Sequence, residues 1–425
     1  MADLSEYHTK LLNPDFYTSL AYRDAFKQLR DEDPVHWVED SDYGKDYWTV
    51  TRYDDVKDYL ESPDKFSSRW DTRVPRSPKR RTPEERHAQG IDIEISRSDN
   101  PWHDVYRRPM NKHFSVPAVA RLGHDIDAIV DEIIDDVAER GEADLVEDIA
   151  GRLPILVVLR MLGVPEEDWD LITLASWQWF ASADPRYIID GDEMKTHLHG
   201  LNTVMTYCAA LAANRRKNPQ DDFATVIANM EVDGDPLSPH EMKTWFATII
   251  AGGLETTRNS ASVGTWLFLN NPDQRRLLLE NPRSAKGAVE EVFRWSTPAK
   301  NRLRIANYDF EWHDKKIRTG DWVVAWLASA NMDERQFEDP NRFDITRSPN
   351  EHLALGTGVH MCLGRNLARL ELGTFFPKLL STFPDLEVVE NENPSWIADR
   401  SVTGFTEMKV RFTPVARGTS RRGLS

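Results

Sequence analysis

The hydrophobic pattern of residues 101–285 is mostly that of amphipathic helices. Apolar residues recur there at intervals of three and four, and acidic residues occupy the opposite face. One predicted helix face consists of Ile126, Ile129, Val130, Ile133 and Val137. The helical pattern returns after residue 362, in the segment LGRNLARLELGTFFPKLLSTF. These patterns predict a mainly α-helical protein.

A smaller β portion is predicted at two places and in a short tail. Residues 47–51 (YWTVT) are β-rich, and residues 302–325 read as short strands with a turn at Thr319-Gly320-Asp321.

No repeat and no Gly/Ser-rich linker divides the chain, so we expect a single domain over residues 1–425. The Arg/Pro-rich segment 69–89 is predicted to be a long exposed loop that acts as a lid, and residues 416–425 are predicted to be disordered.

One predicted helix is unusually long. Ser238-Pro239-His240-Glu241 forms a capping box with proline at the first helical position. The apolar residues that follow continue to Leu269, and Asn270-Asn271-Pro272 ends the run. A helix of about 32 residues is roughly 48 Å long and can cross a whole domain.

The middle of this helix has the sequence Ala251-Gly252-Gly253-Leu254-Glu255-Thr256-Thr257. Its glycines are poor helix formers, and its acid and hydroxyls are polar groups in an otherwise apolar helix. Two adjacent glycines cost about 1–2 kcal/mol relative to alanine, and such conflicts concentrate at functional sites. One interpretation is a kinked groove where a planar or diatomic group approaches the backbone, with an acid and a hydroxyl at hand to deliver protons. The other is close helix packing at the glycines with Glu255 in a salt bridge.

The chain has two cysteines, and Cys362 lies in the more informative context. Gly356, Gly358 and Gly364 surround it, and a helix is predicted directly after it. Backbone N–H groups at a helix N-terminus stabilise a thiolate. Because no second cysteine is nearby, a zinc site is improbable, whereas a single thiolate suits the axial position of haem iron. A buried structural cysteine is the alternative, and it is our interpretation of Cys208.

Composition excludes several classes of protein. The 425 residues contain 53 basic and 70 acidic side chains, so the formal charge is −17, which argues against nucleic acid as a general partner. No run of 18 apolar residues and no apolar N-terminal segment is present, so we expect neither a membrane anchor nor a signal peptide. Few cysteines indicate a reducing compartment, and we predict a cytoplasmic protein.

The segment HLALGTGVHMCLGR (352–365) resembles the haem-ligand signature of the cytochrome P450 family, Phe-x-x-Gly-x-x-x-Cys-x-Gly. Gly252 to Thr257 resembles the oxygen-activation segment of that family. Glu291-Val-Phe-Arg294 resembles its Glu-x-x-Arg helix, and Pro340-Asn-Arg342-Phe343 its Pro-x-Arg-Phe turn. The blocks occur in the family's order and extend over about residues 15–415.

The resemblance implies a P450 fold, with haem b buried between the long central helix and the cysteine loop. Cys362 would ligate the iron, in a loop formed with Leu355, Gly356 and Gly364. Leu355 replaces the family's usual phenylalanine, so we expect haem binding with a shifted iron potential. The propionates would be bound by His103, Arg107, Arg304 and His360. Glu291, Arg294 and Arg342 would form a structural charge triad.

The resemblance also implies a monooxygenase that inserts one atom of O2 into a C–H bond of a mostly apolar terpenoid, sterol-like or branched aliphatic molecule. Thr256 and Glu255 would deliver protons beside a kink at Gly252 and Gly253. The residues expected to line the substrate pocket are Ala247, Ile250, Ala251, Leu254, Ala299, Lys300 and Asn301; those expected at the access channel are Trp177, Trp179 and Phe180.

Electrons would come from NAD(P)H only indirectly, through a separate ferredoxin or flavodoxin, because no flavin or iron–sulfur motif is present. Arg108, Lys112 and Arg365 are the expected basic face for that partner. Two alternatives stay open at this point: a haem enzyme driven by peroxide, and a non-enzymatic haem sensor or carrier.

Overall fold

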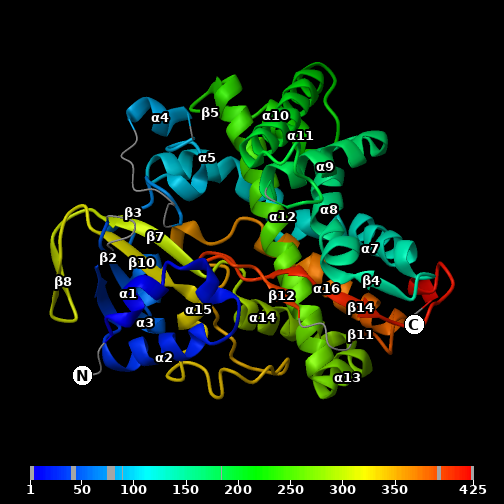
Figure 1. The fold of residues 1–425 in the computed structure, drawn as a ribbon. Helices are drawn as coiled ribbons and strands as arrows, with labels where there is room; N and C mark the ends of the chain where they lie inside the picture. The colour runs from blue at the N-terminus through cyan, green and yellow to red at the C-terminus, as the bar shows by residue number, and fades with distance from the viewer. Residues whose placement is uncertain are drawn as a thin grey trace.

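The computed structural model describes residues 4–39, 45–73, 82–88, 90–182, 184–389 and 394–422. A large group of helices and a smaller sheet lie side by side, and α12 runs between them through the middle of the molecule (Figure 1). The mainly α architecture with a smaller β portion is therefore confirmed. None of the helices in the described ranges combines the length and the apolar character that a bilayer span requires.

The α-helices account for most of the regular structure. They are α1 (Glu6–Lys10), α2 (Tyr22–Glu32), α3 (Tyr53–Glu61), α4 (Pro83–Ala88), α5 (Trp102–Asn111), α6 (Val116–Ala120), α7 (Gly123–Val137), α8 (Arg152–Leu162), α9 (Trp169–Phe180), α10 (Glu193–Lys217), α11 (Phe223–Ala228), α12 (Pro239–Asn270), α13 (Pro272–Glu280), α14 (Ala285–Ser296), α15 (Leu327–Ala330) and α16 (Arg365–Thr382).

The strands are short and belong to several small sheets. They are β1 (Val35–Val38), β2 (Tyr47–Val50), β3 (Phe66–Ser67), β4 (Glu142–Asp144), β5 (Glu231–Val232), β6 (Asp235–Pro236), β7 (Asn301–Ala306), β8 (Phe310–Trp312), β9 (Lys315–Ile317), β10 (Trp322–Trp326), β11 (Glu387–Val388), β12 (Ser395–Trp396), β13 (Phe405–Glu407) and β14 (Lys409–Arg411). The largest sheet has the order β1-β2-β10-β7-β3, and within it only β2 and β10 pair in parallel.

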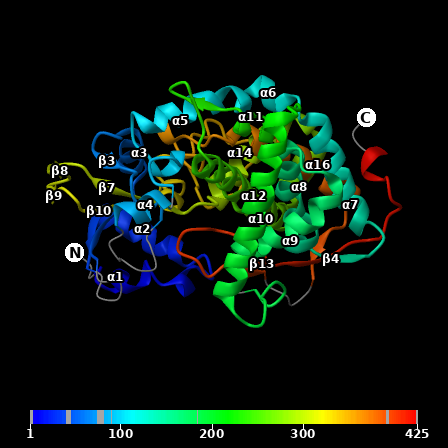
Figure 2. The same ribbon diagram turned by 90° about the horizontal axis from the view of Figure 1, so that it is seen from above.

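The predicted long helix is confirmed as α12, which has 32 residues. Ser238 and Glu241 form the capping box in both directions, and Pro239 is the first helical residue. α-Helical structure continues across both central glycines. It packs against α8 and α10 on one side and against α14 and α16 on the other, as two perpendicular views show (Figures 1 and 2).

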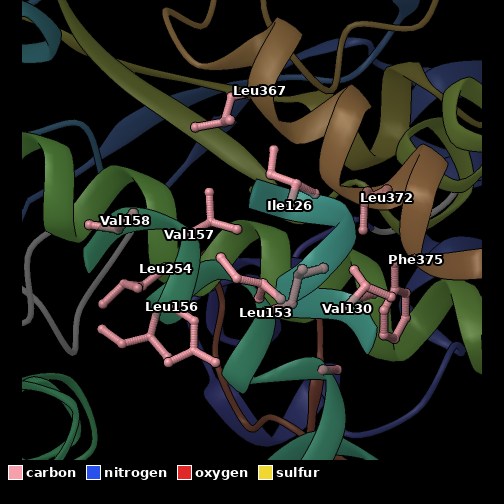
Figure 3. Close-up of a cluster of buried hydrophobic side chains, with 14 of the residues drawn as sticks. Ile126, Val130, Leu153, Leu156, Val157, Val158, Leu254, Leu367, Leu372 and Phe375 are labelled. Atoms are coloured by element: carbon pink, nitrogen blue, oxygen red, sulfur yellow. The ribbon is translucent and has the colours of Figure 1, made fainter. Parts of the chain in front are cut away.

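The main hydrophobic core lies where α7, α8, α12 and α16 meet. All the apolar residues of the predicted α7 face are buried there. Figure 3 shows Val157 and Leu153 of α8 between side chains of α7 and α16, with Leu254 of α12 beside Leu156 and Val158. This packing fixes the rotation of α12 about its axis, and with it the side of the helix that faces away from α8.

Two predictions about loops need correction. Within the segment 69–89, residues 83–88 form α4 rather than loop, while residues 74–81 and 89 lie outside the described residues. The tail is not disordered as far as residue 422. Arg417 pairs with Asp136 at 2.9 Å and Arg421 with Asp135 at 3.0 Å, so acidic residues of α7 hold this end of the chain.

Glu371, in the middle of α16, is a buried acid whose Oε2 has no hydrogen-bond partner in the described structure. Burial raises the pKa of this carboxyl from 4.5 to about 8. Between these values the folded protein binds a proton that the unfolded chain has released, so this group makes stability fall as pH rises.

We therefore expect Glu371→Gln and the wild type to have the same free energy of unfolding near pH 4.5. As the pH rises to 8.5, the variant should become increasingly more stable than the wild type. The expected gain is about 2–5 kcal/mol, at about 1.4 kcal/mol per pKa unit. Urea unfolding at pH 4.5, 6.5 and 8.5 measures it, with Glu280→Gln at the exposed end of α13 as the control. A stability difference that does not change with pH contradicts the prediction.

Candidate active site

Cys362 lies in a loop that tight glycine turns shape. Gly356 and Gly358 have φ angles of 68° and 67°, which glycine adopts without the penalty that other residues incur. The N–H of Cys362 donates to the carbonyl oxygen of Leu355 at 2.8 Å and closes the loop. Leu355 itself packs against the main core, as expected of an apolar residue at this position.

The sulfur of Cys362 faces groups that stabilise negative charge. It accepts a hydrogen bond from the N–H of Gly364, the residue that caps the N-terminus of α16. Burial raises the pKa of the thiol, while this N–H and the guanidinium groups of Arg302, Arg107 and Arg365 act in the opposite direction. The loop can therefore hold a thiolate when a cation binds the sulfur.

The four residues expected at the propionates are brought together beside this loop. The rings of His103 and His360 lie 4.4 Å apart, and Arg107 donates to the carbonyl of Met361. His360 is surrounded by Arg304, His103 and Arg107, and burial together with these groups lowers its pKa to about 2. Burial lowers the pKa of His103 as well. Arg107 and Arg304 are therefore the permanent cations of this cluster.

Ala251 and Gly252 are exposed in the middle of α12, where the helix is otherwise covered. A Cβ placed on Gly252 would meet no atom within 4 Å, whereas one placed on Gly253 would lie 3.0 Å from Val158 of α8. The two glycines therefore differ in their surroundings. Gly253 permits close helix packing, and Gly252 borders open space.

The acid and the hydroxyl lie next to this open space. Thr256 Oγ1 donates to the carbonyl oxygen of Gly252 at 3.2 Å, which leaves its lone pairs free. Glu255 forms an ion pair with Arg73 at 3.4 Å, so the carboxylate is tied to the segment that follows β3. Arg73 had no signal in the sequence beyond its place in an arginine-rich loop.

The predicted charge triad is wrong in one member. Glu291 and Arg294 are fully buried and form a two-pronged ion pair at 2.8 Å. The third cation is Arg347, whose Nε lies 3.3 Å from Glu291. Arg342 contributes only its carbonyl oxygen, which accepts from Arg294, because its side chain is 62% exposed and lies closest to Asp344.

This correction predicts different effects for two arginines five residues apart. Arg347→Ala removes a cation from a buried carboxylate together with bonds to the carbonyls of Glu338, Asp339 and Arg342, so we expect a loss of about 3 kcal/mol. Arg342→Ala is the matched control, with an expected effect within about 0.5 kcal/mol. Urea unfolding measures both, and equal losses in the two variants contradict the assignment.

Several residues expected in the substrate pocket are buried in the described structure. Ile250 and Leu254 belong to the main core, and Figure 3 shows Leu254 beside Leu156 and Val158 of α8. Ala247 is partly buried, and Ala251 is exposed beside Gly252.

The strand residues of the predicted pocket are also buried. Ala299 bridges Val402, Lys300 Nζ donates to the carbonyls of Asp399 and Val402, and Asn301 donates to Arg400. Burial lowers the pKa of Lys300 to about 7. The amine of Lys300 therefore bonds to the chain's own carbonyls. Arg302, which was not among the predicted residues, donates to the carbonyl of Asn301 at 2.8 Å, and its charge acts to lower the pKa of the Cys362 thiol.

Two further groups of predicted residues are the basic face for the redox partner and the aromatics of the access channel. Arg108 and Lys112 are exposed at the end of α5, and Arg365 is partly exposed at the start of α16. Trp177 stacks with Tyr187, and Trp179 stacks with Phe180 at 4.4 Å. All three predicted channel aromatics thus belong to α9.

The comparison with known proteins agrees with the resemblance of the motifs. The model of the family "Cytochrome P450" matches residues 188–412. The steroid C26-monooxygenase of Mycobacterium tuberculosis is 34% identical over 405 residues, which are 95% of this chain and 97% of that protein. The chain belongs to the cytochrome P450 family.

Other P450s are similar over nearly the whole chain. The methyl-branched lipid omega-hydroxylase of M. tuberculosis is 33% identical over 92% of this chain and 90% of its own length. The crystal structure of CYP108D1 from Novosphingobium aromaticivorans is 30% identical with a TM-score of 0.84, and covers 97% of this chain and 99% of that one. The protein is accordingly a P450 monooxygenase that uses haem and O2.

The described residues fit a haem. Nε2 of His103 is buried and has no hydrogen-bond partner among the described residues, which fits a donor to a propionate oxygen. The sulfur of Cys362 is the one thiol near these cations, because Cys208 is buried in α10. Open space beside Gly252 provides room on the side of α12 that carries Thr256.

Proposed function

We propose that this P450 hydroxylates a C–H bond of an apolar aliphatic small molecule of the terpenoid, sterol-like or branched-chain type. The observation that carries the proposal is the accessible backbone of Ala251 and Gly252 next to Glu255 and Thr256. An acid and an alcohol beside an open space are what proton delivery during O2 reduction requires. The substrate class is supported by the names of the relatives, a steroid C26-monooxygenase and a methyl-branched lipid omega-hydroxylase.

In this proposal Cys362 would hold the haem iron through its thiolate, Arg107 and Arg304 would neutralise the propionates, and His103 and His360 would donate hydrogen bonds to them. When bound, haem supplies the reduction of O2, in which one oxygen atom enters the substrate and the other leaves as water. Two electrons and two protons are consumed. The Cys362 loop would keep the sulfur as a thiolate, because the N–H of Gly364 and the nearby guanidinium groups lower the pKa of this thiol.

The protein's own part in this reaction is the movement of protons. Glu255 accepts a proton from solvent when its ion pair with Arg73 opens, and passes it toward the hydroxyl of Thr256. Thr256 then donates into the open space beside Gly252 instead of to the Gly252 carbonyl. A rotation of one hydroxyl is sufficient, because Oγ1 already lies at that edge of α12.

We further propose that electrons arrive from a ferredoxin or flavodoxin reduced by NAD(P)H, which docks near Arg108, Lys112 and Arg365. Acidic electron carriers are attracted by such a local basic face even when the net charge of the chain is −17.

The experiment is a binding screen with the purified holoenzyme, using a 3-oxosteroid, a methyl-branched fatty alcohol and a monoterpenoid as probes. We expect at least one class to shift the Soret band as bound water is displaced. We expect the same class to yield a monohydroxylated product with ferredoxin, its reductase and NADPH. Absence of both shift and product for all three classes overturns the proposed substrate class, and haem binding without NADPH-dependent product favours a sensor or carrier.

A further inference from the structure

A groove of about 310 Å³ lies between α4 and α5, near the N-terminal end of α12 (Figure 1). This volume falls within the range of small-molecule binding sites. Two isoleucines and two aromatic rings form an apolar wall of the groove, namely Ile91, Ile93, Trp102 and Tyr106. The groove therefore suits a ligand with an apolar body.

The groove also contains an arginine that has no acidic partner. Its other arginine, Arg69, is neutralised by Asp92 in a two-pronged ion pair with N–O distances of 2.6 and 2.7 Å. Among the described residues, no carboxylate lies within ion-pair distance of Arg86, and the Nε of Arg86 is buried without a hydrogen-bond partner. A buried N–H group without an acceptor is unfavourable. Arg86 therefore offers its guanidinium group to an anion that would enter the groove.

Packing holds Arg86 in place without an ion pair. Its guanidinium carbon lies 4.5 Å from the centre of the Trp70 ring, which is the distance of a cation–π contact. The helix that carries it is fastened to α12, because Nε2 of His240 donates to the carbonyl oxygen of His87 at 2.7 Å. A side chain that is already positioned loses little freedom when a ligand binds, and this favours affinity.

The groove and the predicted propionate ligands lie on different faces of α5. Trp102 and Tyr106 are four residues apart on this helix, and His103 and Arg107 follow each of them by one position, which is a rotation of about 100°. Trp102 has an exposed fraction of 46%, and Tyr106 uses its hydroxyl to donate to Glu241. The two rings therefore offer apolar surface to the groove and not to the cofactor.

We propose that this groove is a second ligand site, which binds an aliphatic carboxylate outside the haem pocket. Nε and one Nη of Arg86 would donate two parallel hydrogen bonds to the carboxylate. The aliphatic chain would cover Trp102 and the isoleucines, and so remove apolar surface from water. A ligand bound here does not reach the iron, so the inference goes beyond the proposed function and does not depend on it.

The test uses the holoenzyme saturated with 4-phenylimidazole, which binds the iron and so occupies the haem pocket. Calorimetry then measures the binding of decanoate and of 1-decanol. We expect decanoate to bind about 10- to 100-fold more tightly than the alcohol, as for hydrogen bonds to a charged group, without a change in the Soret band. Arg86→Gln should lose this preference, and Arg86→Lys, which keeps the charge, should retain part of it.

Two further variants complete the test. Trp102→Ala should weaken the binding of the acid and the alcohol alike, by about 3- to 10-fold, because both chains would cover the indole. Arg318→Gln is the control, since it removes one positive charge from an exposed arginine after β9 and should change neither affinity. Circular dichroism checks that the variants are folded.

Three results overturn the proposal. They are an absence of decanoate binding to the phenylimidazole-saturated holoenzyme, equal affinities for acid and alcohol in the wild type, and a preference for the acid that is unchanged in Arg86→Gln. Failure of the proposed function is a separate outcome, because it concerns product formation in the haem pocket, which this binding experiment does not use.

Discussion

Cys362→Ala is expected to abolish the red-shifted Soret band that reduced thiolate-ligated haem gives with carbon monoxide, and to reduce monooxygenase turnover to background. The sulfur is the one thiol beside the cluster of Arg107, Arg302 and Arg365, and the N–H of Gly364 donates to it. Without the thiolate, haem keeps only its propionate and apolar contacts. We expect a lower haem content and, for the haem that stays bound, a spectrum typical of a neutral ligand.

The matched control for this prediction is Cys208→Ala. Cys208 is buried in α10, and burial alone raises the pKa of its thiol to about 12, so it is an inert core residue. This variant should keep the carbon monoxide band, the haem content and the turnover of the wild type. Circular dichroism checks that both variants are folded. A thiolate band in Cys362→Ala contradicts the assigned ligand.

The features that were predicted correctly from the sequence are those that local chemistry determines. The capping box at Ser238 and Glu241, the apolar face of α7 and the strand at residues 47–50 depend on residues within a few positions of one another. The loop around Cys362 is of the same kind, because its glycines adopt the positive φ angles that the turns need. The gathering of His103, Arg107, Arg304 and His360 could not follow from spacing, and came from the resemblance to a family.

The errors concern side-chain direction, which depends on packing between distant segments. Lys300 and Arg302 are two residues apart, yet the first bonds to the carbonyls of Asp399 and Val402 and the second to the carbonyl of Asn301. Arg342 and Arg347 belong to one turn region, and the turn decides which of them reaches Glu291. No local sequence pattern distinguishes the two members of each pair, because both are long cationic side chains that can make the same kinds of contact.

Thr256→Ala is expected to separate O2 consumption from product formation. The hydroxyl of Thr256 lies at the edge of the open space beside Gly252, since it donates to the Gly252 carbonyl. Alanine removes this hydroxyl and leaves the backbone hydrogen bonds of α12 in place. Protons then arrive from less ordered donors, and O2 takes up two electrons and two protons to leave as H2O2. We expect product per NADPH to fall by about 10²-fold. NADPH oxidation should change by only a few-fold, with H2O2 accounting for the difference.

Two further variants test whether the loss of coupling is specific to the hydroxyl at position 256. Thr265→Ala removes a hydroxyl that also bonds to the carbonyl four residues earlier, at 2.9 Å, but in the buried part of α12. It should lose some stability and keep its coupling. Thr256→Ser retains the hydroxyl and should recover most of the product yield. Coupling that is unchanged in Thr256→Ala, or equally reduced in Thr265→Ala, contradicts the assigned role. In that case proton delivery would have to reach the open space from Glu255 without the threonine, because the carboxylate is the other acid–base group at this edge of α12.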